Sequence, residues 1–228
     1  MTPKPVEDLF AALDYRFRDP ALLDEALTHP SAEPAAGGAH YDRLEFLGDR
    51  VLALVVSDHL LRRYADAGAG TLARQLTALV RRECLADVAA EIGLGDYLVL
   101  SAGERASGGP RKPAILADAC EALIAALYLD GGLEAAASFV HRYWDPRAEE
   151  VAAAPKDAKT ALQEWAHAHG APAPLYTVTG SEGPAHAIEF TVTVRVGDHP
   201  PAEGQGRSKR GAQQLAAQAL LATLDCEG

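Results

Sequence analysis

The spacing of apolar residues changes once along this chain, and that change restricts the possible folds more than any other feature. Up to about residue 150, apolar residues recur at intervals of three and four, the pattern of packed α-helices. Later, LYTVTGSE and HAIEFTVTVRV alternate apolar with polar residues, as strands do. HPPAEGQGR is predicted as a short third strand and SKRGAQQLAAQALLATL as an amphipathic helix. The sequence therefore predicts two domains, an all-α N-terminal domain and a small α+β domain of order α-β-β-β-α.

The domain boundaries are predicted from composition. Residues 1–150 form the helical domain, VAAAPKDAK supplies a linker at 151–156, and residues 157–228 form the second domain. Within the first domain, SAGERASGGPRKP is predicted as a polar break between helices. The Gly131-Gly132 pair and Pro146 are each predicted to end a helix. The first helix of the second domain is predicted to begin after Asp157 and to stop at Gly170.

Charge, cysteine content and hydropathy restrict the compartment and the partners. The formal net charge of −11 is a poor match to a polyanion, but residues 156–228 carry six basic against eight acidic residues and can still present a positive patch. The cysteines Cys84, Cys120 and Cys226 are odd in number and form no CxxC pair, which fits a reducing cytosol. No apolar run approaches the ~20 residues of a membrane span, and the N-terminus has no apolar signal core. A cytoplasmic protein without a membrane partner is expected.

Acidic residues recur in two apolar helical segments. In HYDRLEFLGDRVL, Asp42, Glu45 and Asp49 lie three and four residues apart, so their carboxylates share one face of a helix. In ILADACEALIAALYLD, Asp118 and Glu121 lie three apart among apolar residues. Like charges at these spacings repel by a few tenths of a kcal/mol, and burial adds to that cost unless the acids are paired, protonated or bound to a cation.

Two interpretations of these acids remain open. If the two helices pack together, four carboxylates converge into a set of oxygen ligands suited to Mg²⁺, those of Glu45, Asp49, Asp118 and Glu121. A water on such a metal can be deprotonated to attack a phosphodiester, and a second metal can stabilise the leaving oxygen. Alternatively, the acids form exposed faces that are balanced by Arg43 and Arg50. Spacing alone does not decide between the two.

The segment YDRLEFLGDRVL closely resembles the ribonuclease III family signature, whose usual form is NERLEFLGD followed by apolar residues. LFAALDYRFRDPALLDEALTHPS resembles the opening helices of that family, and GERASGGPRKPAILADACEALIAALYLDGG its second acidic motif. The last seventy or so residues resemble the double-stranded-RNA-binding domain that follows in the bacterial enzymes. The resemblance covers nearly the whole chain and implies an endonuclease domain followed by an RNA-binding domain.

The resemblance also implies roles for the acids. The metal-binding residues of the family fall on Glu45, Asp49, Asp118 and Glu121, and Asp49 and Glu121 are the ones expected to be catalytic. Mg²⁺ is the expected cofactor, with Mn²⁺ able to substitute. Asp42 stands where the family usually has glutamate, and a role beside the metal ligands or in contact with RNA is implied. A glutamate that many members carry before a glycine is replaced here by Ala69.

Further residues are implied to contact the partner subunit or RNA. Phe46 corresponds to an aromatic residue that inserts into the partner subunit of a homodimer; core packing is the alternative. Arg111 and Lys112 are interpreted either as phosphate ligands or as part of a solvated loop. In the second domain, phosphate contacts are expected at a helix N-terminus and ribose contacts on the first helix and a strand loop. These residues are Arg207, Ser208, Lys209 and Arg210, then Thr160, Gln163 and Glu164, and finally His186.

The expected function is Mg²⁺-dependent cleavage of double-stranded RNA by a cytoplasmic homodimer. The products are expected to carry 5′-phosphate and 3′-hydroxyl ends with short 3′ overhangs, and ribosomal RNA precursors and messages are the expected substrates by analogy with the family. One rival is a non-cleaving double-stranded-RNA-binding protein on the same fold, although all four acids are present here. Another is a small-molecule metal hydrolase with a helical acid cluster.

Overall fold

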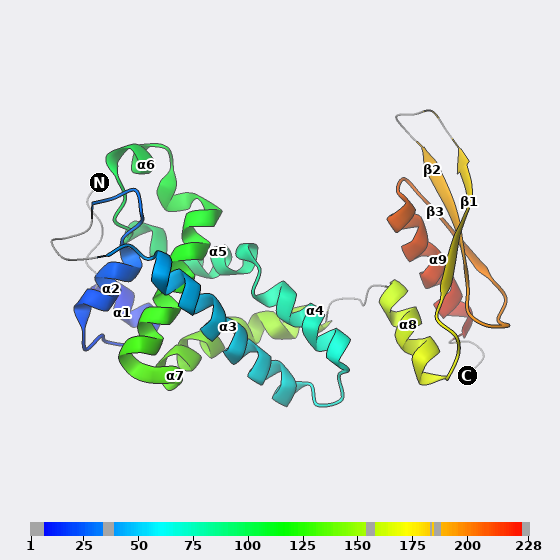
Figure 1. The fold of residues 1–228 in the computed structure, drawn as a ribbon, viewed down its shortest axis with the longest axis horizontal. Coiled ribbons are helices and arrows are strands. Elements are labelled where there is room, and N and C mark those ends of the chain that lie inside the picture. Colours follow the sequence, from blue (N-terminus) through cyan, green and yellow to red (C-terminus); the bar gives the residue numbers. More distant parts are fainter. Residues whose placement is uncertain (1–6, 34–38, 154–157, 183, 185–187, 225–228) are drawn as a thin grey trace. The chain divides into compact units, whose positions relative to one another are not determined.

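The computed structural model describes the chain except for residues 1–6, 34–38, 154–157, 183, 185–187 and 225–228. Two compact units are present, Met1–Ala153 and Ala154–Gly228 (Figure 1). The first is built from helices, and the second places three antiparallel strands beside two helices. The predicted fold class is therefore confirmed.

In the first unit, the long helices α3 and α7 provide most of the framework. Its helices are α1 (Glu7–Leu13), α2 (Pro20–Leu27), α3 (Asp42–Arg63), α4 (Ala69–Leu79), α5 (Arg82–Glu91), α6 (Ala102–Ala106) and α7 (Pro113–Ala153), with short 3₁₀ turns η1 (Leu94–Asp96) and η2 (Gly109–Arg111). Helix α7 packs against α2, α3, α4 and α5 (Figure 1). Its first half is almost completely buried, from Ile115 to Leu127, apart from the two acidic residues that it carries.

The glycine-rich break predicted at residues 101–113 contains α6 and η2, and side chains hold both turns. The Ser101 hydroxyl accepts a hydrogen bond from the backbone N–H of Glu104 at 3.1 Å and so caps α6. Lys112 Nζ lies 2.6 Å from Glu104 Oε1 and 3.0 Å from Ser107 Oγ. The predicted polar break does separate the longer helices α5 and α7, and local capping and ion pairing add the short α6 and η2 within it.

Helix α7 bends once, at the place the glycine pair predicts. Gly132 has φ 76° and ψ −175°, a conformation open to glycine, and it separates two helical parts. Pro146 does not end the second part, contrary to expectation, and the helix continues to Ala153. An interior proline costs about 3 kcal/mol. That cost is offset because the adjacent Trp144 is only 2 % exposed and donates from Nε1 to the carbonyl of Leu79 at 2.9 Å; a buried tryptophan contributes about 3–5 kcal/mol.

The continuation of α7 also changes the expected linker. Val151, Ala152 and Ala153 are helical, as the helix-forming tendency of alanine favours, so the linker predicted at 151–156 begins too early. Its remaining residues lie outside the described part of the chain. By length and composition α7 also meets the requirement for a membrane span, with 44 % of its most apolar window buried. We interpret α7 as a core helix, because it is bent at Gly132 and packs against four other helices.

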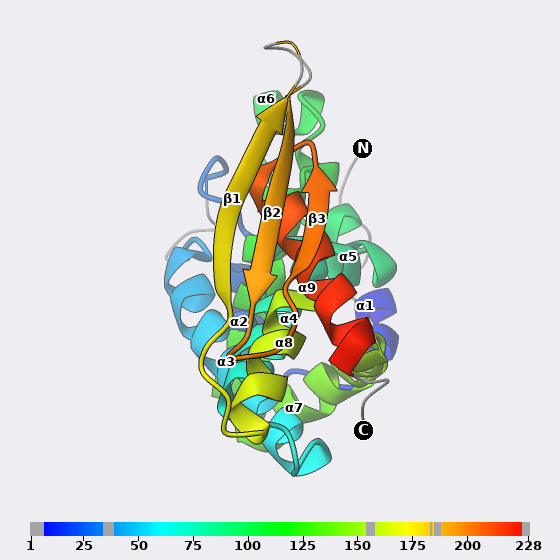
Figure 2. The ribbon, with the colours of Figure 1, turned by 90° about the vertical axis from the view of Figure 1, so that its right-hand side faces the viewer.

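The second unit is a three-stranded sheet covered by helices. Its elements are α8 (Ala158–Ala168), β1 (Leu175–Glu182), β2 (Glu189–Arg195), β3 (Ala202–Gly206) and α9 (Lys209–Leu224). The strands pair in the order β1-β2-β3, all antiparallel, with α9 behind them (Figure 2). The small core contains Val192, Val194 and Val196 from the sheet side. These valines pack with buried residues of α8 and α9.

Two glycines of the second unit have identifiable structural roles: Gly204 allows close packing, and Gly170 follows the end of a helix. Gly204 in β3 lies so close to α9 that an added Cβ would overlap the backbone of Ala216, which fixes helix against sheet. Gly170 has φ 63° and follows the end of α8, so the predicted stop is confirmed. The predicted cap Asp157 lies outside the described residues.

Candidate active site and RNA-binding surface

The candidate active site is built where α3 and α7 touch. Gly48 is buried in the middle of α3, and a Cβ added there would overlap the backbone carbonyl of Glu121 in α7. This contact brings the two acidic motifs together. Glu45 lies almost one turn before Gly48, and Asp118 almost one turn before Glu121, so all three acids are placed on the same side of the helix pair.

Three of the four predicted metal ligands form one group. Glu45, Asp118 and Glu121 each offer a carboxylate oxygen within 4.8 Å of the others. They line an open cavity of about 400 Å³ whose remaining lining residues are Phe46, Asp49, Arg50, Arg82 and Ala117. Asp49 thus faces the same cavity, but its carboxylate forms an ion pair with Arg50. The predicted convergence of the acid-bearing helices is present, with Asp49 beside the group of three.

The arrangement makes ionisation of the three grouped acids less favourable than in water. Burial raises the pKa of Glu121 to about 7, helped by the charges of Glu45 and Asp118 and opposed by Arg82 and Arg50. Burial is also the main cause that raises the pKa of Glu45, followed by repulsion from Asp118. For Asp118, burial raises the pKa while Arg82 opposes it. The cavity therefore favours either a bound proton or a bound cation.

The charges and donor atoms of the cavity fit a divalent cation of the hard type. Four carboxylates face two guanidinium groups, so the fully ionised cavity carries two excess negative charges. Carboxylate oxygens are the ligands that Mg²⁺ and related cations prefer. A cation at this position would balance the excess charge and favour the ionised form of Glu121, against the effect of burial on its pKa.

Two residues that help to build this site, Arg82 and Gly48, are not identified by the spacing of the acids. Arg82 is the first residue of α5, faces the cavity and lowers the pKa of all three grouped acids. Its position depends on the packing of α5 against α7, which VRREC alone does not reveal. Gly48 had a weaker signal, since an isolated glycine inside an apolar helical pattern often marks close packing.

Other predicted residues surround the site in different ways. Asp42, the first residue of α3, is exposed and lies outside the group of three, yet its charge raises the pKa of Glu45 and Asp118 after the effects of burial. Phe46 is 68 % exposed, which excludes core packing. Arg111 is exposed at the end of η2. Lys112 is held by Glu104, an arrangement that competes with a phosphate for the same ammonium group.

The second unit presents basic residues at the start of α9. Ser208 accepts a hydrogen bond from the backbone N–H of Gly211 at 3.1 Å and so caps this helix. Arg207, Lys209 and Arg210 are exposed around the same end. The Nζ atom of Lys209 lies 5.7 Å from the centroid of the Phe190 ring, which directs its long side chain across the sheet. Free N–H groups, the helix dipole and three cations together make this end attractive to phosphate.

Helix α8 is placed next to α9 by direct contacts. Lys159 Nζ lies 2.6 Å from Gln213 Oε1. Of the residues predicted to contact ribose, Gln163 is exposed, whereas Thr160 and Glu164 are half-buried. His186 lies outside the described residues. The described part of the predicted RNA-binding set therefore comes from two neighbouring helices.

Comparisons with known proteins agree with this organisation. A family profile described as Ribonuclease-III-like matches residues 19–146, and one described as Double-stranded RNA binding motif matches residues 158–224. Ribonuclease 3 of Mesorhizobium japonicum is 52 % identical over 91 % of this chain and 94 % of its own length. Ribonuclease 3 of Vibrio cholerae is 46 % identical over 98 % and 99 % of the two chains. The crystal structure of the nuclease domain of ribonuclease III from Campylobacter jejuni matches with a TM-score of 0.59 and 40 % identity, covering 63 % of this chain and 96 % of that one. This chain belongs to the ribonuclease III family.

Proposed function

We propose that this chain is a Mg²⁺-dependent endoribonuclease that hydrolyses double-stranded RNA and leaves 5′-phosphate and 3′-hydroxyl ends with short 3′ overhangs. Membership of the ribonuclease III family makes it an endoribonuclease, and the double-stranded RNA binding motif makes duplex RNA its partner. The observation that carries the assignment of the metal is the carboxylate group of Glu45, Asp118 and Glu121 at the contact of α3 and α7. Mn²⁺ is expected to replace Mg²⁺, because the ligands are oxygens.

The four acids of the cavity and Arg82 each have a role in this proposal. Glu45, Asp118 and Glu121 would hold the metal, and Asp49 completes the set of acids that face the cavity. A bound Mg²⁺ supplies a water of lowered pKa and a positive charge beside the scissile phosphate. Asp49 and Glu121 are proposed as the catalytic residues. Arg82 limits the repulsion among the acids and so favours their ionised, ligating form.

Metal binding should depend on pH through Glu121. Its folded-state pKa of about 7 exceeds the ordinary 4.5, so protons stabilise the metal-free fold and this stabilisation is lost as pH rises from about 4.5 to 7. Mg²⁺ needs the ionised carboxylate and competes with that proton. The increase in melting temperature caused by Mg²⁺ is therefore expected to be larger at about pH 8 than at about pH 6. Calorimetric scans of the wild type and Glu121→Gln measure this; an equal increase at both pH values in the wild type would contradict the proposed ligand.

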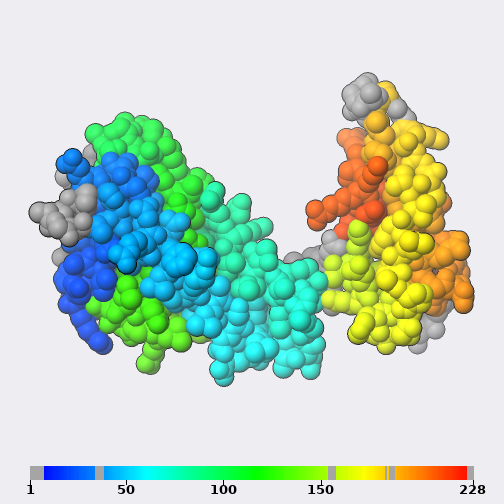
Figure 3. Space-filling model, in the orientation of Figure 1, coloured from blue at the N-terminus to red at the C-terminus, as the bar shows by residue number. Residues whose placement is uncertain are grey.

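We further propose that the first unit forms the homodimer through α3. Phe46, Leu54 and Leu61 lie seven and eight residues apart, share one side of the helix and are 68 %, 57 % and 62 % exposed. Helix α3 runs along the surface of the first unit (Figure 3, blue to cyan). In such a dimer, each subunit contributes one acid-lined cavity, so that the two strands of a duplex are cut separately.

RNA binding is proposed to use the second unit. The proposed contact residues are Thr160, Gln163, Glu164, His186, Arg207, Ser208, Lys209 and Arg210. An A-form duplex offers 2′-hydroxyls in its shallow minor groove and phosphates across the major groove, which a domain of this type recognises by shape. Ribosomal RNA precursors and structured messages in the cytoplasm are the proposed natural substrates.

Replacing Lys209 and Arg210 together by alanine tests the phosphate contacts. Each lost contact should lower the slope of log K against log salt by about one unit, so a decrease of about two is expected. Cleavage at saturating RNA should be retained, because the acid cluster is untouched. Arg195→Ala is the matched control, because Arg195 is also an exposed cation. It lies at the opposite end of β2 from Phe190, the residue that pairs with Gly206 just before α9. An unchanged slope in the double variant would contradict the proposed surface.

Substrate choice tests the function as a whole. A perfect RNA duplex, the same sequence as single-stranded RNA and a DNA duplex of equal length are incubated with the wild-type chain and Mg²⁺. Cleavage confined to the RNA duplex, with 5′-phosphate product ends, is the expected result. Binding of the RNA duplex without cleavage would instead favour a non-cleaving RNA-binding protein.

A further inference from the structure

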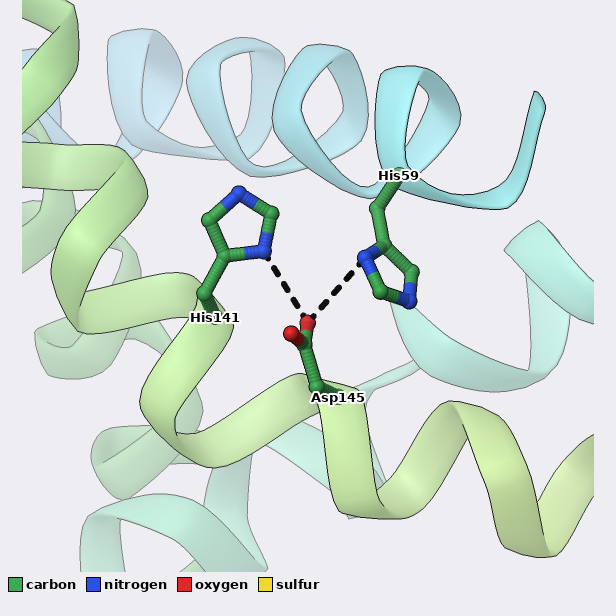
Figure 4. A group of neighbouring side chains, drawn as sticks. All are labelled: His59, His141 and Asp145. Atoms are coloured by element: carbon green, nitrogen blue, oxygen red, sulfur yellow. Dashed lines mark hydrogen bonds and ion pairs between the residues drawn. The ribbon is translucent and has the colours of Figure 1, made fainter. Parts of the chain in front are cut away.

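A second group of potential ligands lies away from the acid cluster. His59 is near the end of α3, and His141 and Asp145 are one turn apart on α7 after its bend (Figure 4). The Nδ1 atoms of His59 and His141 lie 3.3 and 3.0 Å from the same oxygen, Oδ1 of Asp145. The two imidazole rings lie 5.4 Å apart between centroids, at 53° to each other. Both imidazoles therefore direct Nδ1 at the same carboxylate oxygen, and three potential ligand atoms from two helices are brought together.

The group sits on an apolar floor and is open to solvent above it. The floor consists of Val56, Leu79, Val140, Trp144 and Ala148, all of them buried. The side chain of His59 is 18 % exposed, and those of His141 and Asp145 are 42 % and 41 % exposed. The rings are thus partly fixed by packing, while an ion and its water can still reach the donor atoms.

The donor set differs from that of the active-site cavity. Two imidazole nitrogens and one carboxylate oxygen suit Zn²⁺ and its neighbours among the transition metals, whereas an all-carboxylate set suits Mg²⁺. One donor atom from each of the three residues lies within 4.8 Å of the others. A tetrahedral ion with bonds of about 2.0–2.1 Å keeps its ligand atoms roughly 3.3 Å apart, which is close to the observed 3.0 and 3.3 Å.

The spacing along α7 supports the same conclusion. His141 and Asp145 lie four residues apart, and ligands at this spacing share one face of a helix, as the paired histidines of helical zinc sites do. The third ligand, His59, comes from the neighbouring helix α3. No residue of this group lines the acid cavity, and none of the grouped acids lines the floor beneath the histidines.

We propose that His59, His141 and Asp145 form a second metal site, which binds a transition-metal dication of the zinc type with water as the remaining ligand. The site joins the end of α3 to the second half of α7, the part that contains Pro146. Its expected effect is on the stability of the helical unit, since binding to the folded state alone stabilises that state. It takes no direct part in phosphodiester hydrolysis and does not depend on the function proposed above.

Cobalt(II) is a suitable probe, because tetrahedral Co²⁺ with nitrogen ligands absorbs visible light strongly and octahedral Co²⁺ with oxygen ligands only weakly. The full chain is titrated with Co²⁺ above about pH 7.5, because high pH favours metal binding by imidazole, with excess Mg²⁺ present to occupy the acid cluster. One strongly absorbing equivalent per chain is expected, displaced by Zn²⁺ and not by further Mg²⁺. Zn²⁺ should also raise the melting temperature of the wild type.

Two variants separate a metal site from a plain hydrogen-bonded group. Asp145→Asn keeps an oxygen that can accept a hydrogen bond from either imidazole, and His141→Gln removes one nitrogen ligand. Both are expected to weaken Co²⁺ and Zn²⁺ binding at least about tenfold and to lose the Zn²⁺-dependent increase in melting temperature, with melting in the absence of metal close to wild type. His167→Gln, which changes an exposed histidine of α8, is the control and should bind as the wild type does. Absence of the absorbing species in the wild type, or equal affinity in both site variants, would overturn the proposal.

Discussion

Replacing Glu121 by glutamine is expected to abolish cleavage while leaving duplex binding intact. Glutamine has nearly the same shape but lacks the charge, so it removes a metal ligand from the group formed with Glu45 and Asp118. Metal-ion stabilisation of a transition state amounts to several kcal/mol, which corresponds to a loss of roughly a thousandfold in rate or more. Binding should persist because the proposed RNA contacts lie in the second unit, among them residues of α8 and of the start of α9.

A second Glu→Gln substitution on α7, away from the cavity, tests whether the loss of any carboxylate from this helix is enough to affect cleavage. Glu150→Gln changes an exposed residue near the end of α7, far along the helix from the cavity. It should cut and bind as the wild type does. Cleavage by Glu121→Gln within about tenfold of the wild type would show that this carboxylate is not part of the catalytic group.

Replacing Gly48 by alanine is expected to have a comparably large effect, through structure rather than charge. The added Cβ would overlap the carbonyl of Glu121, which belongs to the backbone and cannot rotate away. The helices α3 and α7 must then separate, which destabilises the first unit by about 3 kcal/mol or more, the upper end of the cost of overpacking. Separation also moves Glu45 away from Asp118 and Glu121, so the increase in melting temperature caused by Mg²⁺ should be lost together with cleavage.

Urea denaturation followed by circular dichroism measures this change in the free energy of unfolding. Gly70→Ala is the matched control, because its Cβ in α4 would meet only the Arg74 side chain, at 3.8 Å. Alanine favours an exposed helix by roughly 1 kcal/mol over glycine, so that variant should be as stable as the wild type or more so. Wild-type stability and cleavage in Gly48→Ala would refute the idea that this close contact assembles the site.

Local spacing predicts much of the fold and part of the site. The change from helical to alternating periodicity identifies the two kinds of domain, because each secondary structure has its own repeat. Spacings of three and four place acids on one face of each helix, and these faces do meet across α3 and α7. The glycine pair at residues 131 and 132 predicts the end of a helix, and α7 is interrupted there by a bend, since φ 76° is open to glycine.

Features that depend on contacts between distant residues could not be predicted in the same way. Pro146 stays inside α7 because the Trp144 side chain is buried against α4, and a local rule for proline contains no such information. Arg82 reaches the cavity from a third helix. His59 lies more than eighty residues from His141 in the sequence, so nothing in the spacing joins the two into one group. Asp49 shares a face with Glu45, yet its side chain rotates to Arg50, a choice that helical spacing does not determine.

The most direct test of the account is a single-turnover measurement on preformed complexes. A perfect RNA duplex is bound without metal to the wild type and, separately, to Glu121→Gln, and Mg²⁺ is then added to both. We expect the wild-type complex to begin to cut on addition of Mg²⁺, at a rate that saturates with Mg²⁺, while the Glu121→Gln complex stays bound and uncut. A wild-type complex that remains uncut, or two complexes that cut at the same rate, would contradict the assignment of the carboxylates between α3 and α7 as the catalytic metal site.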